Sequence, residues 1–196
     1  MKIHILFLTL ISILSFFVIS CNNENPSPML TQAEKVTSFL EAVNKRDVAK
    51  IEELVAEDYI QHNPFIPTGR APFTDLLTTV LADNGTKVSN VRIIEEDTFV
   101  AIHNLWTNAE PFGADTVVTF DILRFDENGK IAEHWDAIQP WASQTVNGNT
   151  MVDGPTNITD LDQTEANKAL AVSIIEDVYC LACPRLDSIP MLCTFS

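Results

Sequence analysis

The sequence predicts one α+β domain in which helices cover one face of an antiparallel sheet. Residues 32–81 contain segments whose apolar side chains recur every three or four positions, as they do along one side of a helix. Residues 87–139 contain segments with the alternation and β-branched composition of strands. Helices that precede a run of strands joined by short turns favour an α+β fold with the helices packed on one sheet face.

The helices have clear start signals. Thr31 followed by Glu34 is a capping-box pattern, and Asp47 is the expected N-cap of the next helix. Three helices are predicted, over Gln32–Asn44, from about Val48 to Ala56, and from Pro72 to about Asn84-Gly85. The segment Tyr59–His62 between the second and third helices is expected to be a short extended piece.

Four strands are expected after the helices. Their approximate ranges are 87–95, 98–108, 115–126 and 130–139. Asp97 marks one turn, and Asn128-Gly129 is a strong hairpin signal between the last two strands. The predicted domain therefore ends in an antiparallel meander.

Three ionisable residues on the last two strands are the leading candidates for a functional site. His134 and Asp136 are two residues apart, so their side chains share one face of the strand. Asp121 interrupts an apolar strand, where an unpaired buried carboxylate would be costly. Arg124 falls on the opposite face by parity, which leaves His134 as the expected partner of Asp121. A structural ion pair between these two residues is the alternative to a pocket role.

The segments Asp121–Asp136 and Tyr59–Pro64 resemble the SnoaL-like polyketide cyclase group, within the superfamily similar to nuclear transport factor 2. The resemblance extends over roughly Thr31 to Gln139. It implies a cone-shaped fold whose curved sheet wraps about three N-terminal helices around a small-molecule pocket. It also implies an acid–base role for Asp136 without cofactor or metal, catalytic roles for His134 and Asp121, and a homodimer formed through the sheets.

Four further residues are expected to contact the substrate. His62 and Asn63 belong to the motif Gln-His-Asn-Pro, and His103 and Trp106 lie on the second predicted strand. The alternatives are that His62 fixes a turn with Asn63, that His103 is a core residue, and that Trp106 is a core or rim aromatic. No metal site is predicted, because the histidines and Asp136 lack the close ligand spacing of a zinc site.

The N-terminus is expected to be a signal peptide. Residues 1–20 contain one charged residue, Lys2, followed by an apolar run, and Val18-Ile-Ser-Cys21 resembles the lipobox of bacterial lipoproteins. The resemblance implies lipidation of Cys21 and an extracytoplasmic protein anchored to the cell membrane or outer membrane. An uncleaved membrane helix is the alternative. Residues 21–30 would be a polar tether, followed by the domain at 31–142.

The net charge of −15 makes nucleic acid a poor partner, because its binding needs a cationic surface. After a polar connector at 143–162, residues 163–196 are expected to form a helix and an irregular tail. Thr164-Glu-Ala-Asn-Lys168 echoes Thr31-Gln-Ala-Glu-Lys35, so this region is interpreted as a truncated or frame-shifted second copy of the domain. Its Cys180-Leu-Ala-Cys183 spacing lacks the second ligand pair of a metal or redox site.

Two functions fit the sequence. The first is a cofactor-free cyclase or isomerase that enolises a small carbonyl compound, with Asp136 as acid and base. The second is a non-catalytic lipoprotein that holds a small apolar metabolite, which the predicted membrane anchor favours.

Overall fold

A computed structural model describes residues 30–82 and 85–176. Three helical segments come first: α1 (Gln32–Lys45), α2 (Val48–Leu54) and α3 (Arg70–Asp75), the last continuing as a π-helical turn over Leu76–Val80. The strands are β1 (Val55–Gln61), β2 (Lys87–Glu96), β3 (Phe99–Thr107), β4 (Thr116–Phe125) and β5 (Ile131–Pro140). A C-terminal helix, α4 (Thr164–Ile175), follows a long connector, and short 3-10 turns occur at Glu110–Phe112 and Leu161–Gln163.

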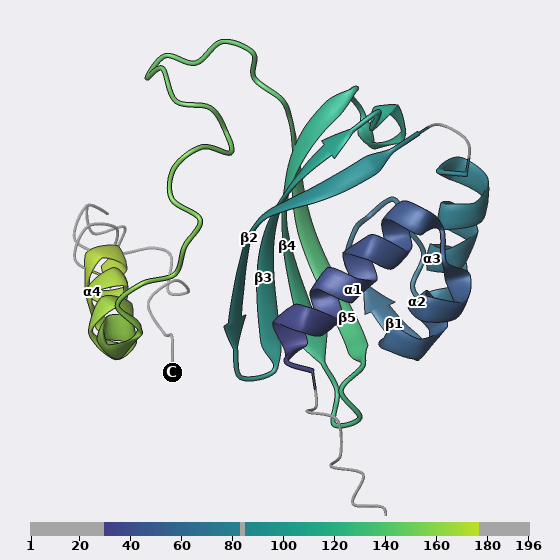
Figure 1. Cartoon of the computed structure of the whole chain (residues 1–196), viewed down its shortest axis with the longest axis horizontal. Helices are drawn as coiled ribbons and strands as arrows, with labels where there is room; N and C mark the ends of the chain where they lie inside the picture. The colour runs from purple at the N-terminus through teal and green to yellow at the C-terminus, as the bar shows by residue number, and fades with distance from the viewer. Residues whose placement is uncertain (1–29, 83–84, 177–196) are drawn as a thin grey trace, which may run out of the picture.

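The five strands form one curved sheet in the order β1-β5-β4-β3-β2. Neighbouring strands are antiparallel except β1 and β5, which pair in parallel. Helices α1, α2 and α3 cover the concave face, called the inner face below, whereas α4 lies on the opposite, outer side (Figure 1). The predicted α+β fold with a curved sheet around N-terminal helices is confirmed.

The start and end of α1 fix it against the sheet. Thr31 and Glu34 form both bonds of the predicted capping box. The helix ends at Arg46, which adopts a left-handed conformation (φ 58°) and whose guanidinium donates to the carbonyls of Val43, Leu81 and Thr86. One side chain thus satisfies the end of α1 and ties it to the segment that enters β2.

The core lies between the helices and the inner face of the sheet. Val36, Ile51 and Leu77 from the helices are fully buried against Val100 and Leu123 from the strands. Alternate residues of β3 and β4 supply this apolar layer, as a half-covered sheet requires. The polar residues described below interrupt that layer at one end.

The sequence-based boundaries were wrong at the second helix and at the first strand. The helix was expected to reach Ala56, but α2 ends at Leu54 and Val55 begins β1. Val55 and Ala56 are buried on an edge strand that pairs with β5, a long-range contact that local periodicity does not reveal. The expected extended piece is therefore the end of a fifth strand.

The C-terminal helix predicted from the recurrence of Ala169, Val172 and Ile175 is present as α4. Among the described residues, no helix is both long enough and apolar enough to cross a membrane. The predicted signal peptide, Cys21, most of the tether, residue 84 and the cysteines after residue 176 lie outside the described residues.

Candidate active site

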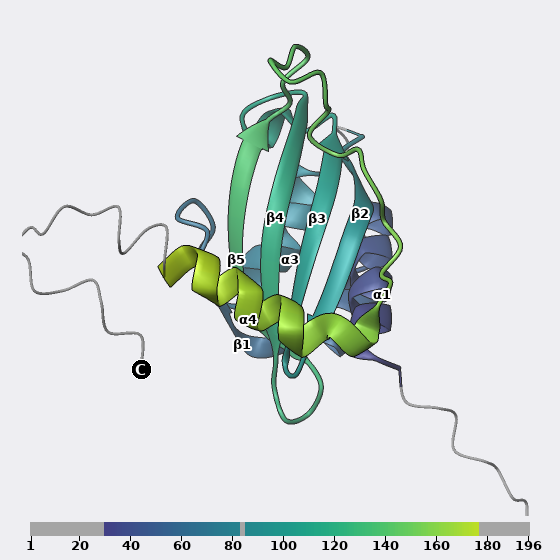
Figure 2. The ribbon, with the colours of Figure 1, turned by 90° about the vertical axis from the view of Figure 1, so that its left-hand side faces the viewer.

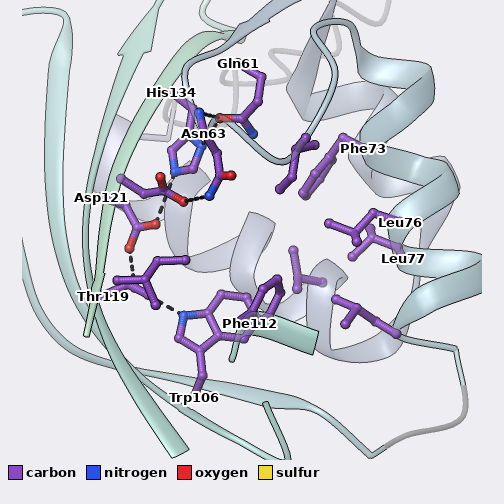
Figure 3. A pocket seen from close by; sticks show the side chains of 15 residues that line it. Gln61, Asn63, Phe73, Leu76, Leu77, Trp106, Phe112, Thr119, Asp121 and His134 are labelled. Carbon is purple, nitrogen blue, oxygen red and sulfur yellow. Dashed lines mark hydrogen bonds and ion pairs between the residues drawn. The ribbon is translucent and has the colours of Figure 1, made fainter. Parts of the chain in front are cut away.

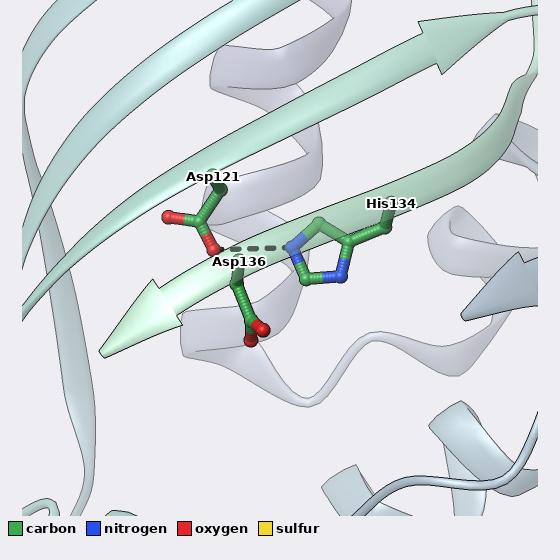
Figure 4. A group of neighbouring side chains, drawn as sticks. All are labelled: Asp121, His134 and Asp136. Carbon is green, nitrogen blue, oxygen red and sulfur yellow. Dashed lines mark hydrogen bonds and ion pairs between the residues drawn. The ribbon is translucent and has the colours of Figure 1, made fainter. Parts of the chain in front are cut away.

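The inner face of β4 and β5 places three ionisable side chains together. Asp121 and Asp136 are direct cross-strand partners, so their side chains point to the same face. His134 shares that face because it precedes Asp136 by two residues, and its ring reaches Asp121 (Figure 4). The parity argument for these three residues is confirmed.

Asp121 is buried, and both of its carboxylate oxygens have hydrogen-bond partners. Its Oδ2 accepts from the hydroxyl of Thr119 at 2.5 Å and from Nδ2 of Asn104 at 2.9 Å, while Oδ1 lies 3.1 Å from Nε2 of His134. Thr119 in turn accepts from the indole N–H of Trp106 at 3.2 Å. A carboxylate with three partners is a fixed anchor for its neighbours, and it has little capacity left to bind a substrate.

His134 has both ring nitrogens engaged. Nδ1 lies 3.0 Å from Oε1 of Gln61, and that oxygen also accepts the backbone N–H of Asn63 at 2.9 Å. Because the backbone donor fixes Oε1 as an acceptor, Nδ1 of His134 must carry a proton. Nε2 of His134 faces Oδ1 of Asp121. His134 therefore orients its neighbours and has no free nitrogen for the substrate.

Asp136 differs from Asp121 in its bonding. Asn63 donates from Nδ2 to Oδ2 of Asp136 at 2.7 Å, and the other carboxylate oxygen accepts no hydrogen bond from the described residues. The amide of Asn63 is itself fixed, because its Oδ1 accepts the backbone N–H of Phe65 at 2.9 Å. Asp136 is thus held firmly by one oxygen while the second remains open. Figure 3 shows Asn63 in the pocket near His134 and Asp121.

Tyr59 completes the polar group from β1. It is buried, and its ring lies 6.4 Å from the His134 ring, with the ring planes nearly parallel. Burial, followed by the charges of Asp121 and Asp136, raises the pKa of Tyr59 well above its ordinary value. The phenol keeps its proton at neutral pH and can act as a hydrogen-bond donor.

The polar group lies where small inner cavities meet a larger vestibule. One inner cavity of about 60 Å³ is lined by Gln61, Asn63, Trp106, Asp121, His134 and Asp136 together with apolar helix residues. A second cavity, also of about 60 Å³, reaches Tyr59. Asp136 and Asn63 also line a vestibule of about 710 Å³, where they are the only polar side chains among the described lining residues. Asp136 therefore stands at the junction, with an apolar space outside it.

Two of the predicted substrate contacts are wrong. His62 lies on the outer side, where its Nε2 is 2.8 Å from Oε1 of Glu133 and its ring stacks on Trp135 at 4.8 Å. His103 is also on the outer face, buried between Arg92 and Phe120. Strand β3 turns even-numbered residues inward, so Trp106 lines the cavity and His103 does not.

Four polar residues of the site were missed by the sequence analysis: Tyr59, Gln61, Asn104 and Thr119. Asn104 and Thr119 could have been found by parity, since each lies two positions before a predicted site residue, Trp106 or Asp121. Tyr59 and Gln61 required knowledge of the parallel β1–β5 pairing, in which Gln61 is opposite His134.

The same three ionisable residues could hold a cation. One ligand atom each of Asp121, His134 and Asp136 can be chosen so that all lie within 4.8 Å of one another, a spacing the sequence did not reveal (Figure 4). The donors around Asp121 and the proton required on Nδ1 of His134 suit proton sharing between these side chains. The absence of a metal cofactor stays a prediction.

Comparison with known proteins gives a consistent family and fold. The family model described as SnoaL-like domain matches residues 36–134, half of the chain. No curated protein matches the sequence. A solved structure of a Kribbella flavida protein named after ketosteroid isomerase aligns with TM-score 0.51 and 14% identity, covering 66% of this chain and 95% of that one. This likeness shows the fold, with the curved sheet and helices of NTF2-like proteins.

Two other solved structures align with lower TM-scores. An NTF2-like protein of unknown function from Cytophaga hutchinsonii aligns with TM-score 0.48 and 15% identity, covering 57% of this chain and 93% of that one. A SnoaL-like polyketide cyclase from Agrobacterium tumefaciens aligns with TM-score 0.47 and 14% identity over the same shares of the two chains.

Proposed function

The chain belongs to the SnoaL-like domain family, and we propose that it is an enzyme that moves a proton on a small carbonyl compound without a cofactor. The observation that carries this proposal is the contrast between the two inner carboxylates. Asp121 has three partners, whereas Asp136 has one partner and an open oxygen at the cavity junction. A general base needs such an open oxygen within reach of its substrate.

In this mechanism Asp136 removes a proton from the carbon next to the carbonyl and returns it to the product. Asn63 keeps the carboxylate in place through both steps, since its own amide is fixed by Phe65. The hydrogen bonds that Asn104 and Thr119 donate to Asp121 stabilise its negative charge beside Asp136, so two carboxylates can share the site. His134 and Asp121, predicted to be catalytic, act here as positioning residues.

The developing negative charge on the substrate oxygen needs a donor. Tyr59 is the best candidate, because it stays protonated and lines the second inner cavity, which shares Asp121 and His134 with the cavity that Asp136 lines. A donor that is already oriented in a water-poor site stabilises such charge far more than water does. Gln61 holds the phenol in place by donating to its oxygen at 3.3 Å.

The cavity sizes indicate the kind of substrate. A space of about 60 Å³ accepts little more than the carbonyl and the atoms next to it. The vestibule of about 710 Å³ is large enough for the rest of an apolar molecule. The proposed substrate therefore has one polar, enolisable end and an apolar body, and reaction as a cyclase or an isomerase is compatible with this arrangement.

A non-catalytic binding protein is the second candidate. The apolar lining of the vestibule favours it, because such a surface can hold a metabolite without any chemistry. In that case Asp136 and Asn63 would fix the orientation of the ligand by hydrogen bonds alone.

Deuterium exchange separates the two functions. Neutral ketones with apolar bodies are incubated with the protein in heavy water, and deuterium next to the carbonyl is followed by NMR. The proposal expects exchange with the wild type, and loss of exchange with Asp136→Asn, while binding and the unfolding midpoint change little. Glu133→Gln is the matched control, since Glu133 lies on the same strand but faces outward. Bound ketones recovered without deuterium would support the binding protein instead.

The cellular location belongs to the same proposal. Lipidation at Cys21, motivated by the lipobox resemblance, would place the domain outside the cytoplasm on a membrane surface. Metabolic labelling with a palmitate analogue should mark the wild type and leave Cys21→Ser unlabelled. Labelling that persists in Cys21→Ser would contradict it.

A further inference from the structure

The outer face of the sheet carries an apolar row next to a charged one. The cross-strand pairs align Ile94, Ala101, Ile122 and Trp135 side by side across β2, β3, β4 and β5. Ile94 and Ile122 are 58% and 45% exposed. The neighbouring row, nearer the β2–β3 turn, begins with Glu96 on β2. We call the four aligned residues the apolar row.

Helix α4 lies over this face and has no buried residue. Figure 2 shows it crossing in front of the strands near the end of β2, and Figure 1 shows that its backbone stands apart from the sheet. Lys168 in its first half forms an ion pair with Glu96. The side chains of Leu170, Val172 and Ile175 remain more than half exposed. An apolar helix and an apolar row thus lie on the same side of the sheet, and apart from His62 and Phe99, whose rings contact Trp135, the described residues leave both exposed.

The dimensions of the helix and the row agree. Twelve helical residues extend about 18 Å, at about 1.5 Å per residue. Four adjacent strands place the first and last residues of the row about 14 Å apart, at about 4.8 Å per strand. Because Lys168 and not the first residue of α4 pairs with Glu96 on β2, about 10 Å of helix from Lys168 to Ile175 extends across the row, which reaches β4 and approaches β5.

The helical periodicity assigns one side of α4 to the sheet. Lys168, Val172 and Ile175 are spaced by four and three residues, so they lie on one side of the helix. Lys168 reaches Glu96, and Val172 and Ile175 lie on the same side of the helix as Lys168, although they are as exposed as Leu170 and Ile174. Leu170 and Ile174 form a separate pair on the other side.

The connector before α4 is fixed to the same face. The guanidinium of Arg92, on the outer side of β2, donates to the carbonyls of Val152, Asp153 and Pro155. Arg92 also bonds to Nδ1 of His103 at 3.1 Å, which anchors it to β3. The polypeptide is therefore held against the sheet about ten residues before α4 begins, and α4 has a limited region in which to dock.

From these contacts we infer that α4 docks on the apolar row of its own chain and covers the outer face of the sheet. The ion pair between Lys168 and Glu96 sets the position of the helix. Val172 and Ile175 then pack on Ile122 and Trp135. A helix of twelve residues is marginal in water by itself, so docking accounts for its order. The outer face is then closed to a second copy, in contrast to the homodimer that the family resemblance implies.

Hydrogen exchange of the full-length chain in detergent tests this docking. The amides of residues 164–175 should exchange at least about tenfold more slowly than those of a free helix. Val172→Glu should abolish the protection, whereas Leu170→Glu, a matched change on the other side of α4, should retain it. Ile122→Glu should act like Val172→Glu. Unprotected amides in the wild type, or equal effects of the two helix variants, would overturn the proposal.

Charge reversal distinguishes docking within one chain from docking between two. Glu96→Lys and Lys168→Glu should each reduce the protection of α4, and the double variant should restore it. A mixture of the two single variants should remain unprotected, because neither chain contains a matching pair. Protection that returns in the mixture, or that rises with protein concentration together with a dimeric mass, would show that a second copy occupies the face.

Discussion

The two faces of the sheet each carry a histidine paired with a carboxylate, and their surroundings give the pairs different properties. On the inner face, His134 and Asp121 lie 3.1 Å apart with side chains 14% and 9% exposed. On the outer face, His62 and Glu133 lie 2.8 Å apart, and 42% of the His62 side chain is exposed. The same type of pair thus occurs on both faces, and burial beside a cavity distinguishes the inner pair from the outer one.

The largest expected difference between the pairs is in stability. Asp121→Ala leaves His134, Thr119 and Asn104 without their shared acceptor in a buried place, which should lower the free energy of unfolding by about 3–5 kcal/mol. Glu133→Ala on the outer face should lower it by no more than about 1 kcal/mol. Urea unfolding followed by circular dichroism measures both changes. Equal losses would mean that burial does not separate the two pairs.

A second difference concerns turnover. If the substrate oxygen is stabilised by Tyr59, Tyr59→Phe should lower the exchange rate by about 10²–10³-fold, because it removes one donor to developing charge. Trp135→Phe, an aromatic change on the outer face, should leave the rate unchanged. Both rates come from the deuterium assay. An unaffected Tyr59→Phe rate would assign the donor role to another residue.

The third difference is in the response to pH. Burial, followed by the charge of Arg92, lowers the pKa of His103 on the outer face, so the folded protein disfavours the protonated ring. The neutral His103 ring makes its full contribution to the free energy of unfolding above the ordinary pKa of about 6.5. This contribution is lost as the pH falls below that value. The free energy of unfolding should therefore decrease more from pH 7 to pH 5 in the wild type than in His103→Phe. Parallel curves for the two proteins would contradict this assignment.

The smallest expected effect is at the exposed pair itself. Hydrogen bonds from His62 and then Arg124 lower the pKa of Glu133, so its contribution is present above about pH 4.5 and is lost as the pH falls further. Glu133→Gln should lower the free energy of unfolding by at most about 1 kcal/mol at pH 7 and by nothing measurable near pH 3. Urea unfolding at the two pH values tests this. A loss that persists at pH 3 would reveal a packing role.

Local patterns in the sequence predicted the fold well. The capping box at Thr31 is present, and strands β2 to β5 begin and end within one or two residues of the predicted ranges. These features depend on neighbours in sequence, which periodicity and turn residues describe. Strand β1 was only partly predicted, because its parallel pairing joins residues more than seventy positions apart, such as Gln61 and His134.

The site residues, too, were predicted correctly where the argument depended on neighbours in sequence. Parity within β5 correctly separated Asp136 from Trp135, and parity within β4 separated Asp121 from Arg124. The prediction that both His103 and Trp106 face the pocket was inconsistent with parity, since residues three apart in a strand point to opposite faces. Similarity of motif placed His62 in the pocket, but its side chain lies outside while its neighbour Asn63 faces in.

The polar chain that supports Asp136 draws on every strand of the sheet, since Asn90 on β2 donates to Asn104, a partner of Asp121. It passes from Trp106 on β3 through Thr119 and Asp121 on β4 to His134 on β5, and ends at Gln61 on β1 beside Asn63. Because these strands come from distant parts of the chain, no fragment made early in synthesis contains Asp136 in this arrangement. Under the proposed role of Asp136, reactivity toward carbonyl compounds would begin only when the last hairpin has joined the edge strand.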